Sequence, residues 1–340
     1  MLIMTKSVLS LMCSFLLSIV IGIILVPLLK KLKAGQSLSI YLSERHKSKN
    51  GTPTMGGLIF IVPTIIITII LIAIKKITIT HNFLIIIFTF IGYALIGFID
   101  DYLIVIRHNN KGLSESAKLL MQVIISVVFF YLFMRSGNEP LLWIHTLNIK
   151  INIGWYYGLF ILLVLVASSN AVNLTDGLDG LAGGLSIIAF LAFGIITWNT
   201  GWLEGYEDIA IFIFILIGSL LGFLLFNLNP AKVFMGDTGS LALGATLGSL
   251  AIITRHELLL IIIGIVFVLE TLCCVIQRVY YKFTKKRIFP MTPIHHTFEK
   301  LGWKEIDIVR LFWVIGLIGA MVSIAFGVLL WKRTNQNYYF

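Results

Sequence analysis

Long apolar runs separated by short polar segments dominate this chain. A run of about 20 apolar residues is long enough to cross the hydrocarbon core of a bilayer as an α-helix. Such runs lie near residues 8–29, 57–74, 82–99, 118–134, 155–171, 180–198, 208–226, 240–254, 258–281 and 311–331. Polar and apolar positions do not alternate with period two inside them, which argues against a transmembrane β-barrel. The pattern predicts an all-α, polytopic integral membrane protein with about ten transmembrane helices, and a single domain over residues 1–340.

Composition agrees with this class, and the positions of the basic residues predict the orientation in the membrane. Of the 340 residues, 58% are hydrophobic and only 12% are charged, as a membrane protein requires. Most of the 26 Lys and Arg residues fall in loops that follow odd-numbered runs, or at the helix ends beside them. Because cytoplasmic loops carry an excess of basic residues, these loops are expected to be cytoplasmic. The formal charge of +10 then describes a face next to anionic lipid and an anionic substrate, and it does not indicate nucleic-acid binding.

The acidic residues gather where the same loops begin or end. The chain has only 16 Asp and Glu residues, and carboxylates at membrane depth are costly unless they hold a cation or transfer protons. Islands that contain carboxylates occupy residues 97–102, 170–180, 235–240 and 295–299, and a fifth polar segment spans 49–57. Because all five lie in or beside odd-numbered loops, they are predicted to meet in one active site at the cytoplasmic face. Glu270, inside the ninth run, is expected to form an interhelical hydrogen bond.

The residue types in these islands indicate metal-assisted phosphoryl transfer. Asp100 and Asp101 lie side by side at the C-terminal end of a predicted helix, where the helix dipole is unfavourable unless a cation compensates. Asp176 and Asp179 share a face if their segment is helical. Asp237 lies among glycines and small hydroxyl residues, where backbone can approach a phosphate or a metal closely. Oxygen ligands without cysteine favour Mg²⁺ or Mn²⁺ over zinc.

Each island also has an ordinary structural interpretation. A solvated helix end would explain the pair Asp100 and Asp101. Capping of a helix N-terminus would explain Asp176 and Asp179, and an ordinary turn would explain residues 236–239. Paired histidines are not by themselves a metal site. The shared membrane face is what favours an active site over these separate explanations.

Five strings, in matching order and spacing, carry a family resemblance. They are GTPTMGG at 51–57, DDY at 100–102, NAVNLTDGLDGLA at 170–182, NPAKVFMGDTGSLALG at 229–244 and PIHHTFE at 293–299. Together they resemble the bacterial phospho-N-acetylmuramoyl-pentapeptide transferases, within the polyprenyl-phosphate N-acetylhexosamine-1-phosphate transferase superfamily. The resemblance covers the chain from about residue 35 to about residue 313.

The resemblance implies a reaction and a location. The substrates would be UDP-N-acetylmuramoyl-pentapeptide and undecaprenyl phosphate, the products lipid I and UMP, and the cofactor Mg²⁺. This is the first membrane step of peptidoglycan synthesis, so the expected location is the bacterial plasma membrane, with membrane lipid as a partner. A homodimer is compatible with the resemblance, and nucleic acid is not an expected partner.

The resemblance also implies residue roles at matching positions. Asp237 is the expected metal ligand, and the expected catalytic group is Asp100, Asp101, Asp237 and His295. The expected substrate-binding residues are Lys49, Thr54, Lys118, Asn173, Asp176, Asp179, Phe234 and His296, with Phe234 as a platform for uracil. Direct attack by the lipid phosphate and an aspartyl-phosphate intermediate both stay open at this point.

Two segments depart from the family pattern. Thr297 stands where the family usually carries a third histidine. Ser39, Leu42 and Ser43 stand where it usually carries an arginine and a glycine-proline pair. Roles that rest on those positions therefore stay open.

Two other functions fit parts of the pattern. A sister enzyme of the superfamily would transfer GlcNAc-1-phosphate to a polyprenyl phosphate, and the PIHHTFE string distinguishes this chain from it. An ion-coupled transporter would place its intramembrane acids near the bilayer midplane on broken helices. The acids here are predicted at one membrane face, so the pentapeptide transferase is the favoured function.

Overall fold

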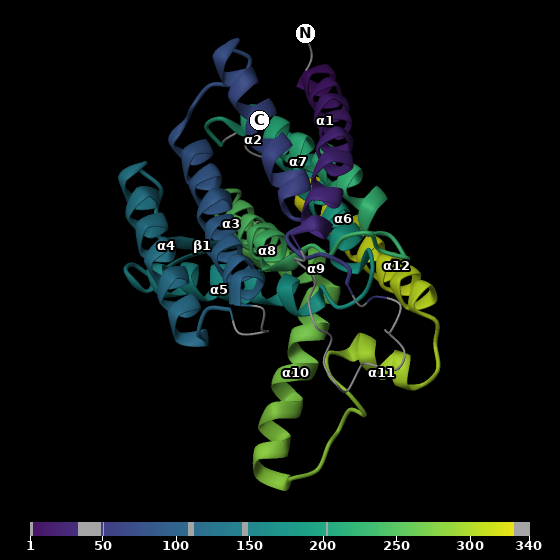
Figure 1. Ribbon diagram of the computed structural model, residues 1–340. Helices are drawn as coiled ribbons and strands as arrows, with labels where there is room; N and C mark the ends of the chain where they lie inside the picture. The colour runs from purple at the N-terminus through teal and green to yellow at the C-terminus, as the bar shows by residue number, and fades with distance from the viewer. Residues whose placement is uncertain are drawn as a thin grey trace.

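The computed structural model describes residues 3–32, 49, 51–107, 112–144, 149–201 and 203–329, and most of them are helical (Figure 1). The first helices are α1 (Ile3–Lys31), α2 (Leu58–Ala73), α3 (His81–Arg107), α4 (Glu115–Arg135), α5 (Tyr156–Thr175) and α6 (Leu181–Trp198). They are followed by α7 (Tyr206–Asn227), α8 (Gly236–Ile253), α9 (Glu257–Ile263), α10 (Ile265–Thr284), α11 (Ile294–Lys300), α12 (Glu305–Ile324) and a π-helical end (Ala325–Leu329). Each predicted apolar run falls mainly on helix where it is described, with a break at Gly264 in the ninth run, so the all-α polytopic class is confirmed.

Fewer helices than the predicted ten meet the length and hydropathy expected of a helix that crosses a membrane alone. Within the described ranges, seven helices are long and apolar enough to cross a membrane alone: α1, α3, α4, α5, α6, α7 and α12. Helices α9 and α10 are bent by 86° at a short break and raise the number to eight if they count as one span. Helix α2 has only 16 residues, and the Gly, Ser and Thr residues of α8 lower its hydropathy. Counting apolar runs therefore gives more candidate spans than counting helices that are both long enough and apolar enough to cross the bilayer alone.

Helix α8 lies inside the bundle, with α3 and α5 packed against it (Figure 1). All of its residues from Thr238 to Ile253 are buried. A Cβ on Gly97 of α3 would lie 2.0 Å from the carbonyl oxygen of Asp237, and a Cβ on Gly244 of α8 would lie 2.2 Å from that of Ser168. Small residues let membrane helices approach this closely. The glycines therefore bring the start of α8 against the C-terminal half of α3, where the acidic pair lies.

A two-stranded antiparallel hairpin, which the sequence did not predict, joins α4 to α5. Strand β1 (Leu141–Ile144) pairs with β2 (Ile149–Asn152). Arg255, which follows α8, donates hydrogen bonds to the carbonyl oxygens of Glu139 and Leu141 at 2.8 and 3.0 Å. The hairpin thus lies at the C-terminal end of α8, away from the acidic islands.

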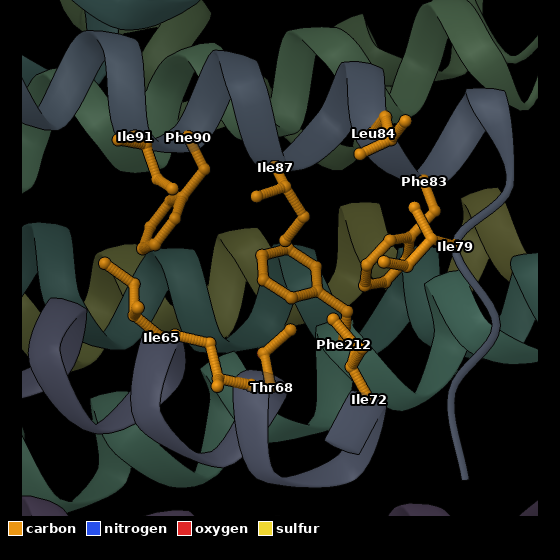
Figure 2. Close-up of a pocket in the computed structure, with 11 residues that line it drawn as sticks. Ile65, Thr68, Ile72, Ile79, Phe83, Leu84, Ile87, Phe90, Ile91 and Phe212 are labelled. Carbon is orange, nitrogen blue, oxygen red and sulfur yellow. The ribbon is translucent and has the colours of Figure 1, made fainter. Parts of the chain in front are cut away.

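An apolar cavity of about 130 Å³ lies between α2, α3 and α7 (Figure 2). Its lining includes Ile65, Phe83, Phe90 and Phe212, and Thr68 is its one polar side chain. None of its lining residues in the described part of the chain is charged, so the cavity is unsuited to an anionic substrate. The chemistry of this protein must be sought elsewhere in the fold.

Candidate active site

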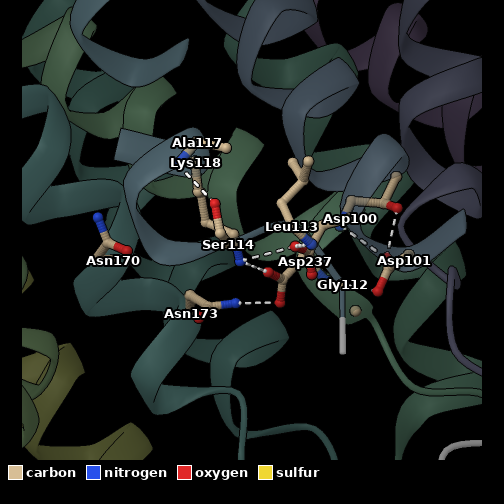
Figure 3. A network of polar contacts seen from close by, with 12 residues as sticks. Asp100, Asp101, Gly112, Leu113, Ser114, Ala117, Lys118, Asn170, Asn173 and Asp237 are labelled. Carbon is tan, nitrogen blue, oxygen red and sulfur yellow. Dashed lines mark hydrogen bonds and ion pairs between the residues drawn. The ribbon is translucent and has the colours of Figure 1, made fainter. Parts of the chain in front are cut away.

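Side chains from four helices meet where α8 begins (Figure 3). The Lys118 ammonium of α4 pairs with Oδ2 of Asp237 on α8 and, at 3.4 Å, with Oδ1 of Asp100 on α3. Nδ2 of Asn173 on α5 donates to Oδ1 of Asp237 at 2.7 Å. The Asp237 and Lys118 side chains are each 22% exposed, against 6% for Asp100. This central cluster of Asp100, Lys118, Asn173 and Asp237 therefore keeps part of its charge accessible to a ligand.

The first turn of α8 is held by Asp101. Gly236 has a φ of +73°, and a Cβ there would lie 2.4 Å from Oδ2 of Asp101, so glycine is required. Oδ2 of Asp101 accepts hydrogen bonds from the backbone N–H and the hydroxyl of Thr238, at 2.9 and 2.6 Å. Its Oδ1 accepts from the N–H of Asp237 at 3.3 Å. A carboxylate at unpaired N–H groups of a helix start is favourable, so Asp101 fixes the position of Asp237.

Asp100 has different surroundings from its neighbour. Its Oδ1 accepts the N–H of Leu113 at 2.7 Å, and a Cβ on Gly112 would lie 2.6 Å from the same oxygen. The segment before α4 therefore folds directly over Asp100, and it leads into the helix that carries Lys118. The structure thus gives the two adjacent aspartates different partners. Asp101 binds the start of α8, and Asp100 belongs to the central cluster.

Asp176 places a further carboxyl group beside this cluster. Burial, followed by the carboxylates of Asp237, Asp101 and Asp179, raises the pKa of Asp176 well above its ordinary value, although the N–H of Gly236 opposes the shift. Carboxylates that raise one another's pKa are stabilised by a cation placed among them. A cation bound at the start of α8 would therefore lower the pKa of Asp176 and favour its charged form.

The donor atoms of the central cluster suit a hard divalent cation. Within the residues that the structure describes, no three His, Cys, Asp or Glu side chains are grouped as a ready-made metal cage. Mg²⁺ does not need one, because it commonly takes one or two carboxylates and completes its shell with water and substrate phosphates. The partly exposed carboxylate of Asp237, with Asp100 across the Lys118 ammonium, fits that requirement.

A second polar group forms around Asp179. Its Oδ1 pairs with the Lys49 ammonium at 2.7 Å, and its Oδ2 accepts from Asn229 Nδ2 and from the N–H of Ala231, at 3.1 and 3.0 Å. The same ammonium pairs with Oε1 of Glu305 at 2.6 Å. Asp176 and Asp179 therefore take part in different groups, although only two residues separate them.

The segment after Lys49 pairs with the segment before α8. The N–H of Phe234 donates to the carbonyl of Pro53, and the N–H of Gly56 donates to the carbonyl of Phe234, both at 2.8 Å. Thr54 is fully buried between them, with its hydroxyl 3.4 Å from Oδ1 of Asp101. The half-buried Phe234 thus lies on the segment that leads directly to Asp237.

The two histidines of α11 differ in burial and in partner. His295 is fully buried, its Nδ1 lies 3.0 Å from Oε1 of Glu270, and Oε2 of Glu270 accepts the N–H of Ile294 at 2.8 Å. A Cβ on Gly177 would lie 2.4 Å from Nε2 of His295, and this nitrogen has no hydrogen-bond partner among the described residues. His295 therefore reaches the turn between Asp176 and Asp179. Glu270 makes the interhelical contact expected of it.

His296 instead contacts a residue of its own helix. Its Nδ1 lies 2.6 Å from Oε2 of Glu299. Thr297, at the position of the family's usual third histidine, exchanges hydrogen bonds with the backbone of Met291 and closes the preceding turn. This position therefore has a structural use here. Ser39, Leu42 and Ser43 lie outside the described residues.

Comparisons with known proteins decide the family. Residues 83–255 match the model of glycosyl transferase family 4, and residues 49–61 match phospho-N-acetylmuramoyl-pentapeptide-transferase signature 1. The chain is 46% identical over 317 residues to a phospho-N-acetylmuramoyl-pentapeptide-transferase of Geobacillus sp. (strain WCH70), covering 93% of this chain and 96% of that protein. The chain belongs to this transferase family. Proteins of the same name from Bacillus subtilis (strain 168) and Oceanobacillus iheyensis are 45% and 42% identical, covering 93% and 94% of this chain and 96% and 98% of theirs.

Family membership and the apolar helices together place this transferase in the membrane. It is a phosphoglycosyl transferase, and a multi-pass protein of the bacterial plasma membrane. The signature begins at Lys49, and the longer match ends at Arg255, just past the C-terminus of α8. The central cluster and the Asp176 turn therefore lie within the matched residues.

Glu305 is the polar contact that the sequence did not point to. It stands in the first turn of α12, where an acidic residue is common because the helix dipole favours it. That ordinary explanation left no reason to connect it with Lys49. The partner is found only when the chain is folded.

Proposed function

We propose that this chain transfers phospho-N-acetylmuramoyl-pentapeptide from its UDP derivative to undecaprenyl phosphate, which gives lipid I and UMP. The names of its relatives supply the donor, and the central cluster supplies a site suited to the reaction. The observation that supports it most is the grouping of Asp237, Lys118 and Asp100 from three helices of a membrane-spanning bundle (Figure 3). Asp100 lies inside α3, which continues to Arg107, and not at a helix end as the sequence predicted. A lipid phosphate and a water-soluble nucleotide can meet at such a place.

The bond changes set what the residues must do. A phosphate oxygen of undecaprenyl phosphate forms a bond to the sugar-bearing phosphorus of the donor, and the bond from that phosphorus to the oxygen of UMP breaks. Negative charge accumulates on the transferred group and on the leaving UMP. Lys118 offsets part of it, and Asp237 would hold Mg²⁺, which supplies charge neutralisation at the diphosphate when bound.

The surrounding residues position these groups. Asn173 holds the Asp237 carboxylate in one orientation, and Asp101 holds the backbone beneath it. Asp100 is the candidate to accept a proton from the lipid phosphate, because Asp101 is committed to the start of α8. Phe234 offers an aromatic face for uracil beside the central cluster.

Orientation follows as part of the proposal. We place the central cluster at the cytoplasmic face, because the loops beside it carry most of the basic residues. Cysteines introduced at Ser114, beside the cluster, and at Trp155, before α5, lie at exposed positions at opposite ends of the bundle. In intact cells an impermeant thiol reagent should label the second and spare the first. The reverse pattern would place the cluster outside. A homodimer stays a prediction that light scattering in detergent can test.

The function is tested by donor choice. Purified protein in detergent is given radiolabelled undecaprenyl phosphate with each UDP-sugar in turn, and the lipid product and UMP are measured. Turnover with the muramoyl-pentapeptide donor is expected, and UDP-GlcNAc should not replace it. Turnover with UDP-GlcNAc alone would show the sister activity instead.

A further inference from the structure

Glu305 closes a ring of four polar side chains next to the candidate active site. The Lys49 ammonium lies 2.7 Å from Oδ1 of Asp179 and 2.6 Å from Oε1 of Glu305. Nδ2 of Asn229 lies 3.1 Å from Oδ2 of Asp179 and 3.2 Å from Oε2 of Glu305. Two carboxylates thus share one ammonium and one amide. We call these four residues the Lys49 ring.

Glu305 makes one further contact in the ring. Its Oε1 also accepts the backbone N–H of Asp179 at 2.7 Å. The turn between α5 and α6, which holds Asp179, is therefore tied to the first turn of α12 by main chain as well as by side chains. A substitution at Glu305 would leave this N–H without its carboxylate acceptor.

The ring joins segments that are remote in the sequence. Glu305 is separated from Lys49 by 256 positions and from Asp179 by 126. Its own helix, α12, packs against α6, which begins just after the Asp179 turn. The carboxylate therefore extends from a helix that is held by packing. Because it contacts both the Lys49 ammonium and the backbone of Asp179, Glu305 can position both groups.

The ring is buried enough for its geometry to matter. The side chains of Lys49 and Glu305 are 13% and 14% exposed, and that of Asp179 is 1% exposed. Ion pairs in water contribute little, but a charge that is largely removed from water loses much when its partner is removed. Loss of Glu305 would therefore leave Asp179 as the one ion-pair partner of Lys49 among the described residues, and the ammonium could take other orientations.

We propose that Glu305 is a positioning residue for the donor nucleotide, acting through Lys49 and through the backbone of Asp179. The inference rests on the proposed function for the identity of the donor. It adds a residue that lies outside all the strings that relate this chain to its family. The nucleotide end of the donor is the part affected, because Asp179 lies in the string matched to nucleotide contacts.

Binding of UMP is the first test, because it needs no turnover. Affinity is measured by titration calorimetry in detergent for the wild type and for Glu305→Ala, Glu305→Gln and Asp307→Asn. Glu305→Ala should weaken UMP binding about tenfold, the loss expected for a charged hydrogen bond. Glu305→Gln keeps an acceptor for the Asp179 N–H but loses the ion pair. Its UMP affinity should therefore lie between those of the wild type and Glu305→Ala. Asp307→Asn is the matched control: it changes an acid of the same turn that is 53% exposed and 4.0 Å from Arg310.

Steady-state kinetics separate positioning from general damage. In Glu305→Ala the KM for the muramoyl donor should rise about tenfold with kcat within about twofold, because the lost contacts act on binding. The KM for undecaprenyl phosphate should not change. A fall in kcat at unchanged donor KM would overturn the proposal.

A double-variant cycle tests the route through Lys49. If Glu305 acts mainly through Lys49, then Glu305→Ala should weaken UMP binding little further in a chain that already carries Lys49→Ala. Fully additive losses would overturn this route. If Glu305→Ala does not fold, as judged by thermal unfolding, then Glu305→Gln decides, and unchanged UMP affinity there overturns the proposal. A wild type that binds UMP but ignores the muramoyl donor would contradict the proposed function and leave the Glu305 test intact.

Discussion

The two ends of α8 carry charged groups that look alike in sequence and differ in structure. At the N-terminal end, Asp237 and Lys118 each keep 22% of the side chain exposed. Just past the C-terminal end, Arg255 and Glu257 are 6% and 4% exposed. Both places hold a basic and an acidic residue near a membrane surface. Their surroundings give the two charged groups different roles.

At the C-terminal end the charges are used by the protein itself. The guanidinium of Arg255 donates to the carbonyls of Glu139 and Leu141 and to the hydroxyl of Tyr157, which lies 2.5 Å from Oε1 of Glu257. This group holds the β-hairpin against α8. At the other end several carboxylates compete for one ammonium. Excess charge that stays accessible, rather than charge alone, distinguishes a candidate active site from a structural cluster.

The sharpest test of the comparison is Asp237→Asn. Turnover should fall about thousandfold, because charge stabilisation in phosphoryl transfer is worth several kcal/mol. UMP affinity and thermal unfolding should change little, since Asn keeps the size of the side chain. Lipid product formation is measured at saturating Mg²⁺. Near-normal turnover there would remove Asp237 from the metal site.

The opposite result is expected for Arg255→Met. It should lower the free energy of unfolding by about 3 kcal/mol, since the carbonyls of Glu139 and Leu141 and the carboxylate of Glu257 lose their cation. Turnover per folded molecule should stay within about twofold, because the site is remote. Unfolding in detergent is compared with the rate per active molecule. A large loss of turnover at unchanged stability would erase the distinction between the two ends.

The adjacent aspartates sharpen the comparison within one cluster. Asp101→Asn should lower the free energy of unfolding by about 1 to 2 kcal/mol, because it weakens the cap of α8. Asp100→Asn should leave the unfolding temperature unchanged and lower turnover about tenfold or more, as loss of a proton acceptor does. If Asp100 accepts the proton of the lipid phosphate, its defect should shrink as pH rises past about 6, where the phosphate ionises unaided. A defect independent of pH would indicate metal binding instead.

The last prediction concerns His256, next to Arg255. Burial lowers the pKa of His256 from 6.5 to about 4, although the carbonyl of Thr254 opposes the shift. Below pH 6.5 the unfolded chain gains a proton that the folded chain does not, so stability falls by about 1.4 kcal/mol per pH unit down to pH 4. Above pH 6.5 this contribution is constant. The His256→Gln variant should lack this loss of stability at low pH when its unfolding is measured from pH 7 to 5. An unchanged pH dependence would mean that His256 is protonated in the folded protein.

The sequence by itself determined the membrane class, the family and the set of candidate residues. Apolar runs of spanning length follow from local composition, and the strings from Gly51 to Glu299 are read directly from the chain. Two runs, an even number, separate each island from the next, and this predicts that all the islands lie on one face. The convergence of Asp100, Lys118, Asn173 and Asp237 is in keeping with that prediction. Their catalytic roles stay predictions until the variants are measured.

Only the tertiary structure decided which partners those residues contact. Asp100 and Asp101 are neighbours of one type in one island, yet the glycine contacts between α3 and α8 direct Asp101 to a helix start and Asp100 to an ammonium. Lys49 and Glu305 meet across 256 positions, and no local pattern records such a pair. Hydrophobicity and helix period are properties of short segments, whereas burial and hydrogen bonding depend on which segments pack together. Function in this chain rests on the second kind of information as much as on the first.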